Sequence, residues 1–440
     1  MPVNKIANDS VAEQMMTPER ALFRGRAVGS SYNNVTVGMD LSRSGRMIRD
    51  AFVSGLLSVG ARVYDASYAP APAIAMVANR SDCCAIAGEP DVYGSFSDIL
   101  LRNPDGSLFD HEQIRSLEKY SKNAALPNYL SIDKIHRVDG VVRRYIERVA
   151  DACGDIDCPV VVDCGCGSAS LAAPQALAAA GADVMSVNSH LDHNYSPRSS
   201  DIGPSEAKDV QAATSSMPGS IGILLNGDGT RVALIDEEAR YVSGSDMLAL
   251  LVKHMQPKKL VVPIDMSSAV DAAFWGEDGL TAGRSIIRCE PDSISLAEVM
   301  KEQQADFGAL SNGTVIMPGM TRCPDGIYAG CMLAKIAGTD SLRRILDEMP
   351  SYVTDETRIQ SKGSVEALSR KISNEIEDLD YKNAVHAGGW RVDMDGGWFL
   401  VERPDHEGVI NIKIEAGDKA YAVGLLEIAK EIVNKGLRSQ

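Results

Sequence analysis

One pattern occurs three times along the chain: a short apolar strand, an amphipathic helix and a second strand. The first copy begins at Val35–Met39 and continues through the helical spacing of MIRDAFVSGLLSVG; the second spans 159–187 and the third spans 259–290. The predicted strands are apolar throughout, which is typical of strands covered on both faces. Strand, helix and strand in this order predict right-handed crossovers and mainly parallel sheets.

Each copy is followed by one further strand that ends in an unusual loop. These strands are Cys83–Ala87, Ile221–Leu225 and Ala305–Ala309, and they lead into GEPDVYGS, NGDGTR and LSNGT. In such sheets, ligands bind beyond the carboxyl ends of the strands. We therefore expect the three loops to line one central cleft.

The C-terminal part of the chain has a different pattern. A charged amphipathic helix (VEALSRKISNEIEDLD) precedes a predicted hairpin around Asp395-Gly396-Gly397, and an alternating strand and a closing helix follow. The fold class is therefore α/β, with three tandem mixed or mainly parallel α/β domains and a C-terminal α+β domain around the cleft. The predicted boundaries are 1–153, 154–255, 256–362 and 363–440.

Composition excludes several classes of protein. The formal net charge of −16 argues against a nucleic-acid or anionic-membrane partner, and a phosphate site would have to gather its own local positive charge. No apolar run reaches the roughly 18 residues of a membrane-spanning helix, and the polar N-terminus lacks a signal-peptide core, so we expect a cytoplasmic protein. Nine scattered cysteines without a CxxC pair are expected to be small buried residues in a reducing compartment.

Several segments are similar to one family. They are VGMDLSRSGRMIRDAFVSGLLSVGARVYDASYAPAPAI, VVVDCGCGSASLAAPQAL, RVALIDEEARYVSGSDMLALL, ADFGALSNGTVIM, PDGIYAGCMLAKI, DGGWFLVERP and INIKIEA. In this order they resemble the four domains of the α-D-phosphohexomutases, which include phosphomannomutases, phosphoglucomutases and phosphoglucosamine mutases. The resemblance covers nearly the whole chain.

The resemblance implies a phosphoryl transfer between the 1- and 6-positions of a hexose. In the family a phosphoserine donates the group, and Mg²⁺ is held by that phosphate and three aspartates. A third-domain loop reads sugar hydroxyls and a fourth-domain loop binds the substrate phosphate. Such chemistry consists mostly of positioning and charge neutralisation.

The serine loop of the family usually reads T-A-S-H-N-P, and this chain has a different sequence, GEPD, at that position. Glu89 occupies the position of the phosphorylated serine, and no serine or threonine precedes Ser95 in this loop. A carboxylate imitates part of the charge of a phosphate but cannot pass a phosphate on as serine does. A glutamyl phosphate at Glu89, or a phosphate on Ser95 or Ser97, is an alternative that the sequence leaves open.

The metal loop of the family usually reads D-G-D-x-D-R, and here it reads NGDGTR, residues 226–231. Asn226, Asp228 and Thr230 are the predicted metal ligands, and two of them have neutral oxygens where Mg²⁺ favours carboxylates. Glu89 and Arg231 are the two predicted catalytic residues. No cofactor is assigned, and weak binding of Mg²⁺ stays open. The alternative is a glycine-rich turn in which Asp228 hydrogen-bonds its own backbone.

The sugar and phosphate loops also differ from the family. In the sugar loop, usually G-E-x-S-G-H, leucine replaces the glutamate and Asn312 remains to hydrogen-bond a polyol. In the phosphate loop, usually R-P-S-G-T-E-P-x-x-R, the chain reads RPDHEGVIN, with Arg403 and His406 as predicted ligands and Asn411 in place of the distal arginine. The two acids of this loop repel a phosphate dianion.

Three interpretations follow, and whether the chain is an enzyme stays open. The first is a phosphohexomutase-like protein without mutase activity, with a binding, regulatory or partner role in carbohydrate metabolism. The second is a divergent active intramolecular phosphotransferase on an unusual phosphosugar. The third is a different chemistry on a cationic or non-phosphorylated ligand, suggested by Glu89, Asp91, Asp405 and Glu407. The expected partners are a phosphosugar or another small polar ligand, or a protein; nucleic acid and membranes are not expected.

Overall fold

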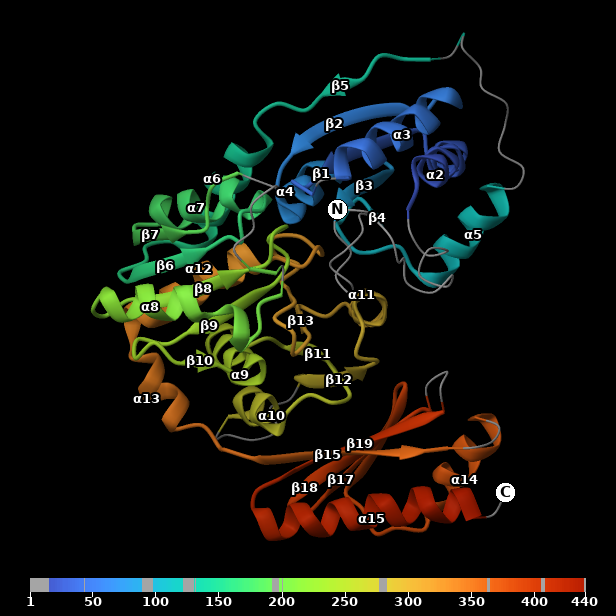
Figure 1. Ribbon diagram of the computed structural model, residues 1–440, viewed down its shortest axis with the longest axis vertical. Coiled ribbons are helices and arrows are strands. Elements are labelled where there is room, and N and C mark those ends of the chain that lie inside the picture. The colour runs from blue at the N-terminus through green and yellow to red at the C-terminus, as the bar shows by residue number, and fades with distance from the viewer. Residues whose placement is uncertain are drawn as a thin grey trace, which may run out of the picture. The chain divides into compact units, whose positions relative to one another are not determined.

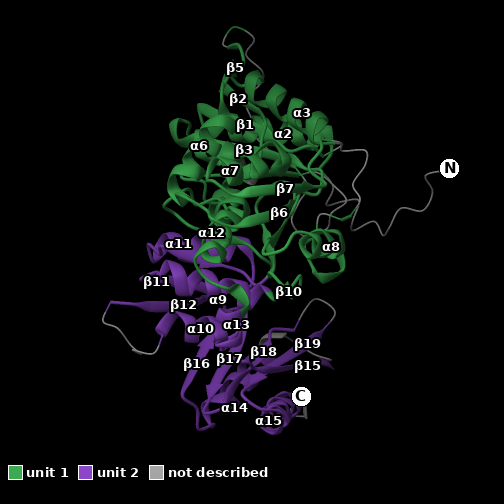
Figure 2. Cartoon of the chain, turned by 90° about the vertical axis from the view of Figure 1, so that its left-hand side faces the viewer, with its two compact units in different colours: residues 1–243, 312–343 green, residues 244–311, 344–440 purple. Residues whose placement is uncertain are grey.

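A computed structural model describes residues 16–42, 44–88, 98–121, 130, 132–191, 198–199, 201–276, 283–361, 365–404 and 408–438 (Figure 1). The chain divides into two compact units. Unit 1 comprises residues 1–243 and 312–343, and unit 2 comprises residues 244–311 and 344–440 (Figure 2). The four predicted domain boundaries stay a prediction, because a division into two units does not locate them.

The first sheet of unit 1 has the order β4-β3-β1-β2-β5. Strands β1, β2, β3 and β5 are parallel, as the crossovers predict, and β4 is antiparallel to β3. The strands are β1 (Asn34–Met39), β2 (Arg62–Tyr68), β3 (Cys83–Gly88), β4 (Asp98–Arg102) and β5 (His136–Arg137). α2 (Pro18–Ser31) precedes β1. The helices that lie between or after the strands are α3 (Gly45–Ser58), α4 (Ala71–Val77), η1 (Ala78–Arg80), α5 (His111–Ser121) and α6 (Val141–Cys153).

The two faces of β1 have different covers. Val35, Val37 and Met39 belong to the core that includes residues of α2 and α3. Because side chains alternate across a strand, Thr36 and Gly38 point to the opposite face. A Cβ on Gly38 would lie 2.5 Å from the side chain of Ile74, so glycine allows α4 to approach this face closely.

The second sheet of unit 1 has the order β10-β9-β8-β6-β7. Its strands are β6 (Pro159–Asp163), β7 (Asp183–Val187), β8 (Ile221–Leu225), β9 (Val232–Ile235) and β10 (Tyr241–Val242). β6 is parallel to β7 and β8, whereas β8 and β9 are antiparallel and are joined by loop 226–231. The other elements here are η3 (Ser168–Leu171), α7 (Ala173–Ala179), η4 (Pro204–Glu206), α8 (Lys208–Ser216), β14 (Val315–Ile316), α12 (Gly326–Thr339) and α13 (Leu342–Asp347).

Unit 2 combines a parallel and an antiparallel sheet. The parallel strands β12-β11-β13 and their helices are α9 (Gly244–Met255), β11 (Lys259–Pro263), α10 (Ser268–Trp275), β12 (Ser285–Cys289), α11 (Ser293–Glu302) and β13 (Phe307–Ala309). The antiparallel sheet has the order β15-β19-β18-β17-β16. Its elements are β15 (Val353–Gln360), α14 (Val365–Glu377), β16 (Asn383–His386), β17 (Gly389–Met394), β18 (Gly397–Glu402), β19 (Val409–Ala416) and α15 (Lys419–Arg438). The predicted hairpin is confirmed, since β17 and β18 pair on either side of Asp395 and Gly396.

A buried arginine joins the two sheets of unit 2. Arg391 is 1% exposed, and its Nη1 donates to the carbonyls of Ile264 and Met266, which follow β11, over 3.1 and 2.6 Å. Its Nε donates to Asp393 over 2.8 Å, and its guanidinium lies 4.3 Å from the centre of the Trp398 ring. Hydrogen bonds to carbonyls and a carboxylate offset the cost of burying this charge.

All nine cysteines are buried and unbridged, as the scattered pattern predicts. Burial raises the pKa of Cys84, Cys164 and Cys323 to about 12, so these thiols are protonated and unreactive at neutral pH. Among the described residues, no helix is long and apolar enough to cross a membrane.

Candidate functional site

Loop 226–231 joins β8 to β9 and is closed by hydrogen bonds among its own side chains. The Thr230 hydroxyl donates to the Oδ1 atom of Asp228 over 2.6 Å, and the Thr230 backbone N–H donates to the same oxygen over 2.9 Å. The Nδ2 atom of Asn226 donates to the Thr230 hydroxyl over 3.0 Å, and its Oδ1 accepts the N–H of Arg231 over 2.8 Å. Asn226 and Thr230 are 4% and 3% exposed. One oxygen of each predicted metal ligand is therefore used within the loop.

The backbone carbonyls of this loop have partners as well. Three consecutive carbonyl oxygens accept N–H groups from the first turns of η3, α4 and α12: Gly227 from Ala169 at 3.0 Å, Asp228 from Ala71 at 3.0 Å and Gly229 from Gly326 at 2.9 Å. N–H groups in the first turn of a helix lack partners within the helix, so the loop satisfies three of them. Gly229 has a φ of +78°, and a Cβ there would lie 2.8 Å from Ile327, so the turn requires glycine.

The residues present in the loop do not fit a magnesium ion. Mg²⁺ requires near-octahedral coordination by hard oxygens, mainly carboxylates, phosphates and water. Asp228 is the single carboxylate of loop 226–231, and one of its oxygens already accepts two hydrogen bonds. Within the described ranges, no group of three or more histidine, cysteine, aspartate or glutamate side chains could hold a metal ion. The interactions that stabilise this loop are hydrogen bonds between neutral groups and one carboxylate.

Arg231 and Asn312 lie on neighbouring turns of unit 1. Arg231 is 9% exposed and forms an isolated antiparallel bridge with Thr314. The N–H of Val232 donates to the carbonyl of Gly313 over 3.1 Å. The side-chain oxygen of Asn312 accepts the N–H of Thr314 over 3.1 Å. The structure thus brings the predicted sugar-binding turn next to Arg231, and Asn312 uses its oxygen to hold that turn.

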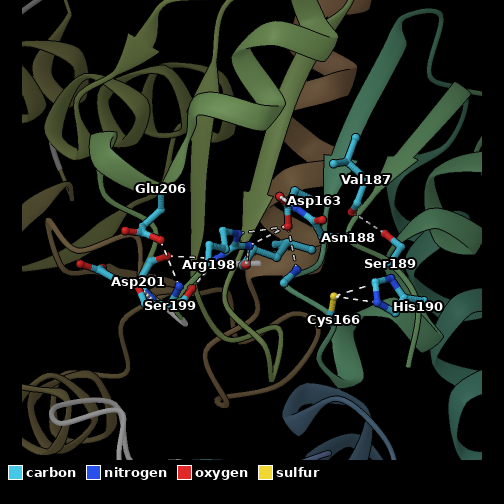
Figure 3. Close-up of polar contacts among 12 residues, drawn as sticks. Asp163, Cys166, Val187, Asn188, Ser189, His190, Arg198, Ser199, Asp201 and Glu206 are labelled. Carbon is cyan, nitrogen blue, oxygen red and sulfur yellow. Dashed lines mark hydrogen bonds and ion pairs between the residues drawn. The ribbon is translucent and has the colours of Figure 1, made fainter. Parts of the chain in front are cut away.

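Asp163, the last residue of β6, is the centre of a buried cluster at the same end of the sheet (Figure 3). Its carboxylate accepts hydrogen bonds from Nη2 and Nε of Arg198 at 2.9 and 3.2 Å, from Nδ2 of Asn188 at 2.7 Å, and from the N–H of Gly165 at 2.7 Å. Arg198 also donates to the carbonyl of Leu225, the last residue of β8, over 2.6 Å. One ion pair therefore links the ends of three neighbouring strands.

Neither Asp163 nor Arg198 was predicted from the sequence to be a site residue. An aspartate that closes the apolar strand PVVVD is a signal for Asp163, because the carboxyl ends of parallel strands meet at one edge. No comparable signal exists for Arg198, which lies 35 residues further along the chain. Only the folded chain shows that the two side chains meet.

Asp325 is a buried carboxyl group close to loop 226–231. It is the N-cap of α12, and Tyr145 and the N–H of Tyr328 donate to its Oδ1 over 2.6 and 2.9 Å. Burial raises the pKa of Asp325 to about 6, and these two hydrogen bonds only partly oppose the rise. Asp163 has an arginine partner, whereas the structure pairs Asp325 with no cation among the described residues.

Polar residues at both ends of the predicted phosphate loop form hydrogen bonds and ion pairs within unit 2. The Nδ2 atom of Asn411 donates to Glu402 over 2.9 Å. The amine of Lys413 lies 2.8 Å from Glu402 and 3.0 Å from Asp265. Arg403 lines a cavity of about 420 Å³ together with residues of α14 and β16. The cation nearest in sequence to Asn411 is thus neutralised by two carboxylates.

Two of the predicted site residues, Glu89 and His406, lie outside the described residues. The same is true of the alternative positions Ser95 and Ser97 and of the acids at 91, 405 and 407. Their roles stay predictions. Of the predicted site residues that the structure describes, Asn226, Asp228, Thr230, Arg231 and Asn312 belong to unit 1 and Arg403 belongs to unit 2.

Comparison with known proteins agrees with this architecture. Residues 7–121 match the family described as phosphoglucomutase/phosphomannomutase, alpha/beta/alpha domain I. A protein of Methanosarcina barkeri named "Probable phosphoglucosamine mutase" is 28% identical over 97% of this chain and 98% of its own length. The phosphoglucomutase/phosphomannomutase of Thermococcus kodakarensis is 27% identical over 97% of both chains.

Solved structures show the same fold. A phosphoglucomutase/phosphomannomutase family protein from Burkholderia thailandensis superposes with a TM-score of 0.82 at 20% identity, over 96% of this chain and 94% of that one. The open form of a Paramecium phosphoglucomutase, parafusin, gives 0.73 at 13% identity, over 97% and 92%. The fold is that of a multi-domain phosphosugar mutase. These similarities support the α-D-phosphohexomutase superfamily, to whose members this chain is similar over nearly its whole length.

Proposed function

We propose that this phosphohexomutase-like chain has lost the mutase reaction and acts as a binding or regulatory protein in carbohydrate metabolism. The observation that carries the proposal is the closure of loop 226–231. Asn226, Asp228 and Thr230 bond to one another, and three successive carbonyls of the loop accept bonds from neighbouring helices. A loop bonded in this way is stable without an ion.

The chemistry of phosphoryl transfer explains why this matters. The transferred group carries negative charge on its equatorial oxygens, and a metal ion with cationic side chains normally neutralises that charge. Here the loop offers one carboxylate to a metal, and Glu89 stands where the family has its serine. Loss of both the metal ligands and the nucleophile removes the two groups that the reaction most depends on.

A divergent active phosphotransferase is the second candidate. The observation in its favour is the sequence similarity, which is 27–28% over 97% of the chain to proteins named as phosphosugar mutases. Such a protein would take its phosphate from another residue, and Ser95, Ser97 or Glu89 are the positions to examine.

One experiment separates the two candidates. The purified chain is incubated with Mg²⁺, a hexose 1,6-bisphosphate and the 1- or 6-phosphate of glucose, mannose or glucosamine, with the Thermococcus kodakarensis relative as the positive control. We expect no interconversion above that of an Asp228→Ala variant. Turnover well above this variant, together with an intact mass increased by one phosphate, would establish the active candidate and overturn the proposal.

A further inference from the structure

Unit 1 has a cavity of about 660 Å³ beside its first sheet, with both polar and apolar residues in its lining. It is lined by Thr36 of β1, Tyr64 of β2, the residues at the end of η1 and the segment that joins β5 to α6. Loop 226–231 contacts Ala71, the first residue of α4, whereas the cavity adjoins Val77, the last residue of that helix. The cavity is therefore separate from the site described above.

The short length of α4 explains why the cavity exists. With seven residues the helix is about 10 Å long, and the six residues of β1 extend over about 20 Å. α4 therefore packs against the Gly38 end of this sheet face, and the cavity lies beyond its last residue, at the Thr36 end. The volume lies in the range of small-ligand sites.

Three arginines gather at this cavity in a chain with a net charge of −16. Arg144 donates to the backbone carbonyls of Asp139 and Gly140, so its charge is not neutralised by a carboxylate there. Arg137 lies 3.4 Å from the carboxylate of Asp139 at an exposed position. In the part of the chain that the structure describes, the side chain of Arg80 has neither a hydrogen bond nor an ion pair. The lining of the cavity thus contains three guanidinium groups and one carboxylate, that of Asp139, so positive charge is in excess there.

A hydroxyl pair adds a donor to the wall of the cavity. The hydroxyls of Thr36 and Ser81 lie 2.7 Å apart, and these residues are 1% and 8% exposed. One hydroxyl donates to the other, and the acceptor keeps its own proton for a further hydrogen bond. Tyr64 and Val77 supply ring and apolar surface nearby.

We propose that this cavity is a second binding site, which takes a small organic phosphate monoester. Arg80, Arg137 and Arg144 hold the phosphate, because guanidinium groups pair with phosphate oxygens in a bidentate manner. The Thr36–Ser81 pair donates to a remaining oxygen, and the organic part lies against Tyr64. A sugar phosphate and a nucleoside monophosphate share this chemistry. The site is independent of the proposed loss of mutase activity.

The test measures binding of glucose 6-phosphate, AMP and inorganic phosphate to the full chain by calorimetry at low salt. We expect at least one organic phosphate to bind more tightly than inorganic phosphate, and an Arg80→Glu variant to bind it about ten- to a hundredfold more weakly. An Arg80→Lys variant keeps the positive charge but lacks the planar guanidinium group. Its affinity is expected to lie between those of the unmodified chain and of Arg80→Glu. Preference for AMP or for glucose 6-phosphate identifies the source of the ligand.

Arg143→Gln is the matched control. Arg143 is the neighbour of Arg144 in α6, and it pairs with Glu147 at the surface without lining the cavity. This variant should bind as the unmodified chain does, and unfolding temperatures should be equal in all the variants. The proposal is overturned if none of the probes binds, if inorganic phosphate binds as tightly as both organic phosphates, or if Arg80→Glu leaves the affinity unchanged.

Discussion

The ends of β6 and β8 are neighbours in one sheet, and they stabilise their polar groups in opposite ways. At the end of β6, Asp163 is fully buried and its carboxylate forms an ion pair with Arg198 over 2.9 Å. At the end of β8, two neutral side chains, Asn226 and Thr230, surround one carboxylate, Asp228. A buried carboxylate is stable beside a cation, and several carboxylates together are stable only when a metal ion replaces that cation.

The comparison shows which changes the fold tolerates. In loop 226–231 the amide of Asn226 and the hydroxyl of Thr230 are neutral, so they hydrogen-bond to each other without the repulsion that further carboxylates beside Asp228 would bring. Removal of one partner from an ion pair leaves the other charge buried. We therefore expect the loop and the ion pair to respond very differently to substitution.

The largest effect is expected for Arg198→Met. The substitution leaves the carboxylate of Asp163 buried without a cation, which costs about 3–5 kcal/mol in the free energy of unfolding. Calorimetric unfolding measures the loss. Arg143→Met, at an exposed i,i+4 pair, is the control and should cost less than about 1 kcal/mol. Equal losses in the two variants would contradict the contrast between the two strand ends.

Asp325→Asn tests a buried carboxyl group that lacks a cation. The folded pKa of Asp325, about 6, lies above its unfolded value of 3.8, so the folded state retains the proton longer. The contribution of this group to stability is therefore fully present below pH 4, falls as the pH rises to about 6, and is constant above that. Asparagine does not titrate, so the variant should gain about 3 kcal/mol relative to the unmodified chain between pH 4 and pH 7.

Urea unfolding of both proteins across this pH range gives the difference directly. If the difference in the free energy of unfolding does not change with pH, Asp325 has an ordinary pKa in the folded chain. Asp325 would then not differ from Asp163 in the way that the prediction requires.

The double variant Asn226→Asp/Thr230→Asp restores three carboxylates to loop 226–231. Without divalent ions we expect a loss of about 2 kcal/mol, because the hydrogen bonds of the loop are replaced by repulsion between buried charges. Mg²⁺ should then raise the unfolding temperature of the variant as a ligand of the folded state. The unmodified chain should show no such rise. A rise of equal size in both proteins would mean that the natural loop binds the ion.

The smallest effect is expected for Asn312→Ala. The substitution removes the acceptor for the N–H of Thr314 on an exposed turn, which costs about 0.5–1 kcal/mol. Thermal unfolding measures the change, and Asn312→Asp, which keeps the oxygen, is the control. A loss above that of the loop variant would place Asn312 in a tighter network than the structure describes.

Much of the fold could be predicted from local patterns. Apolar runs such as Val35–Met39 and Ile221–Leu225 form strands because neither face can be left in water. In the β17–β18 hairpin, a Cβ on Gly397 would lie 2.1 Å from the carbonyl oxygen of Glu415, so glycine is required there by close packing. The positions of loop 226–231 and of the Asn312 turn could also be predicted, because each follows a strand. The partners of their side chains depend on distant residues, and local patterns do not contain them.

The sequence by itself determined that loop 226–231 has one carboxylate and that the chain has a large negative charge. These are properties of composition and order, and folding cannot change them. The tertiary structure determined which contacts the polar and charged side chains form. It joined Asp163 to Arg198, and it closed the loop with N–H groups from three helices. It also gathered Arg80, Arg137 and Arg144 at a cavity that the short helix α4 leaves open. In each case the residues come from separate elements of the fold, so only the packing of the sheets and helices brings them together.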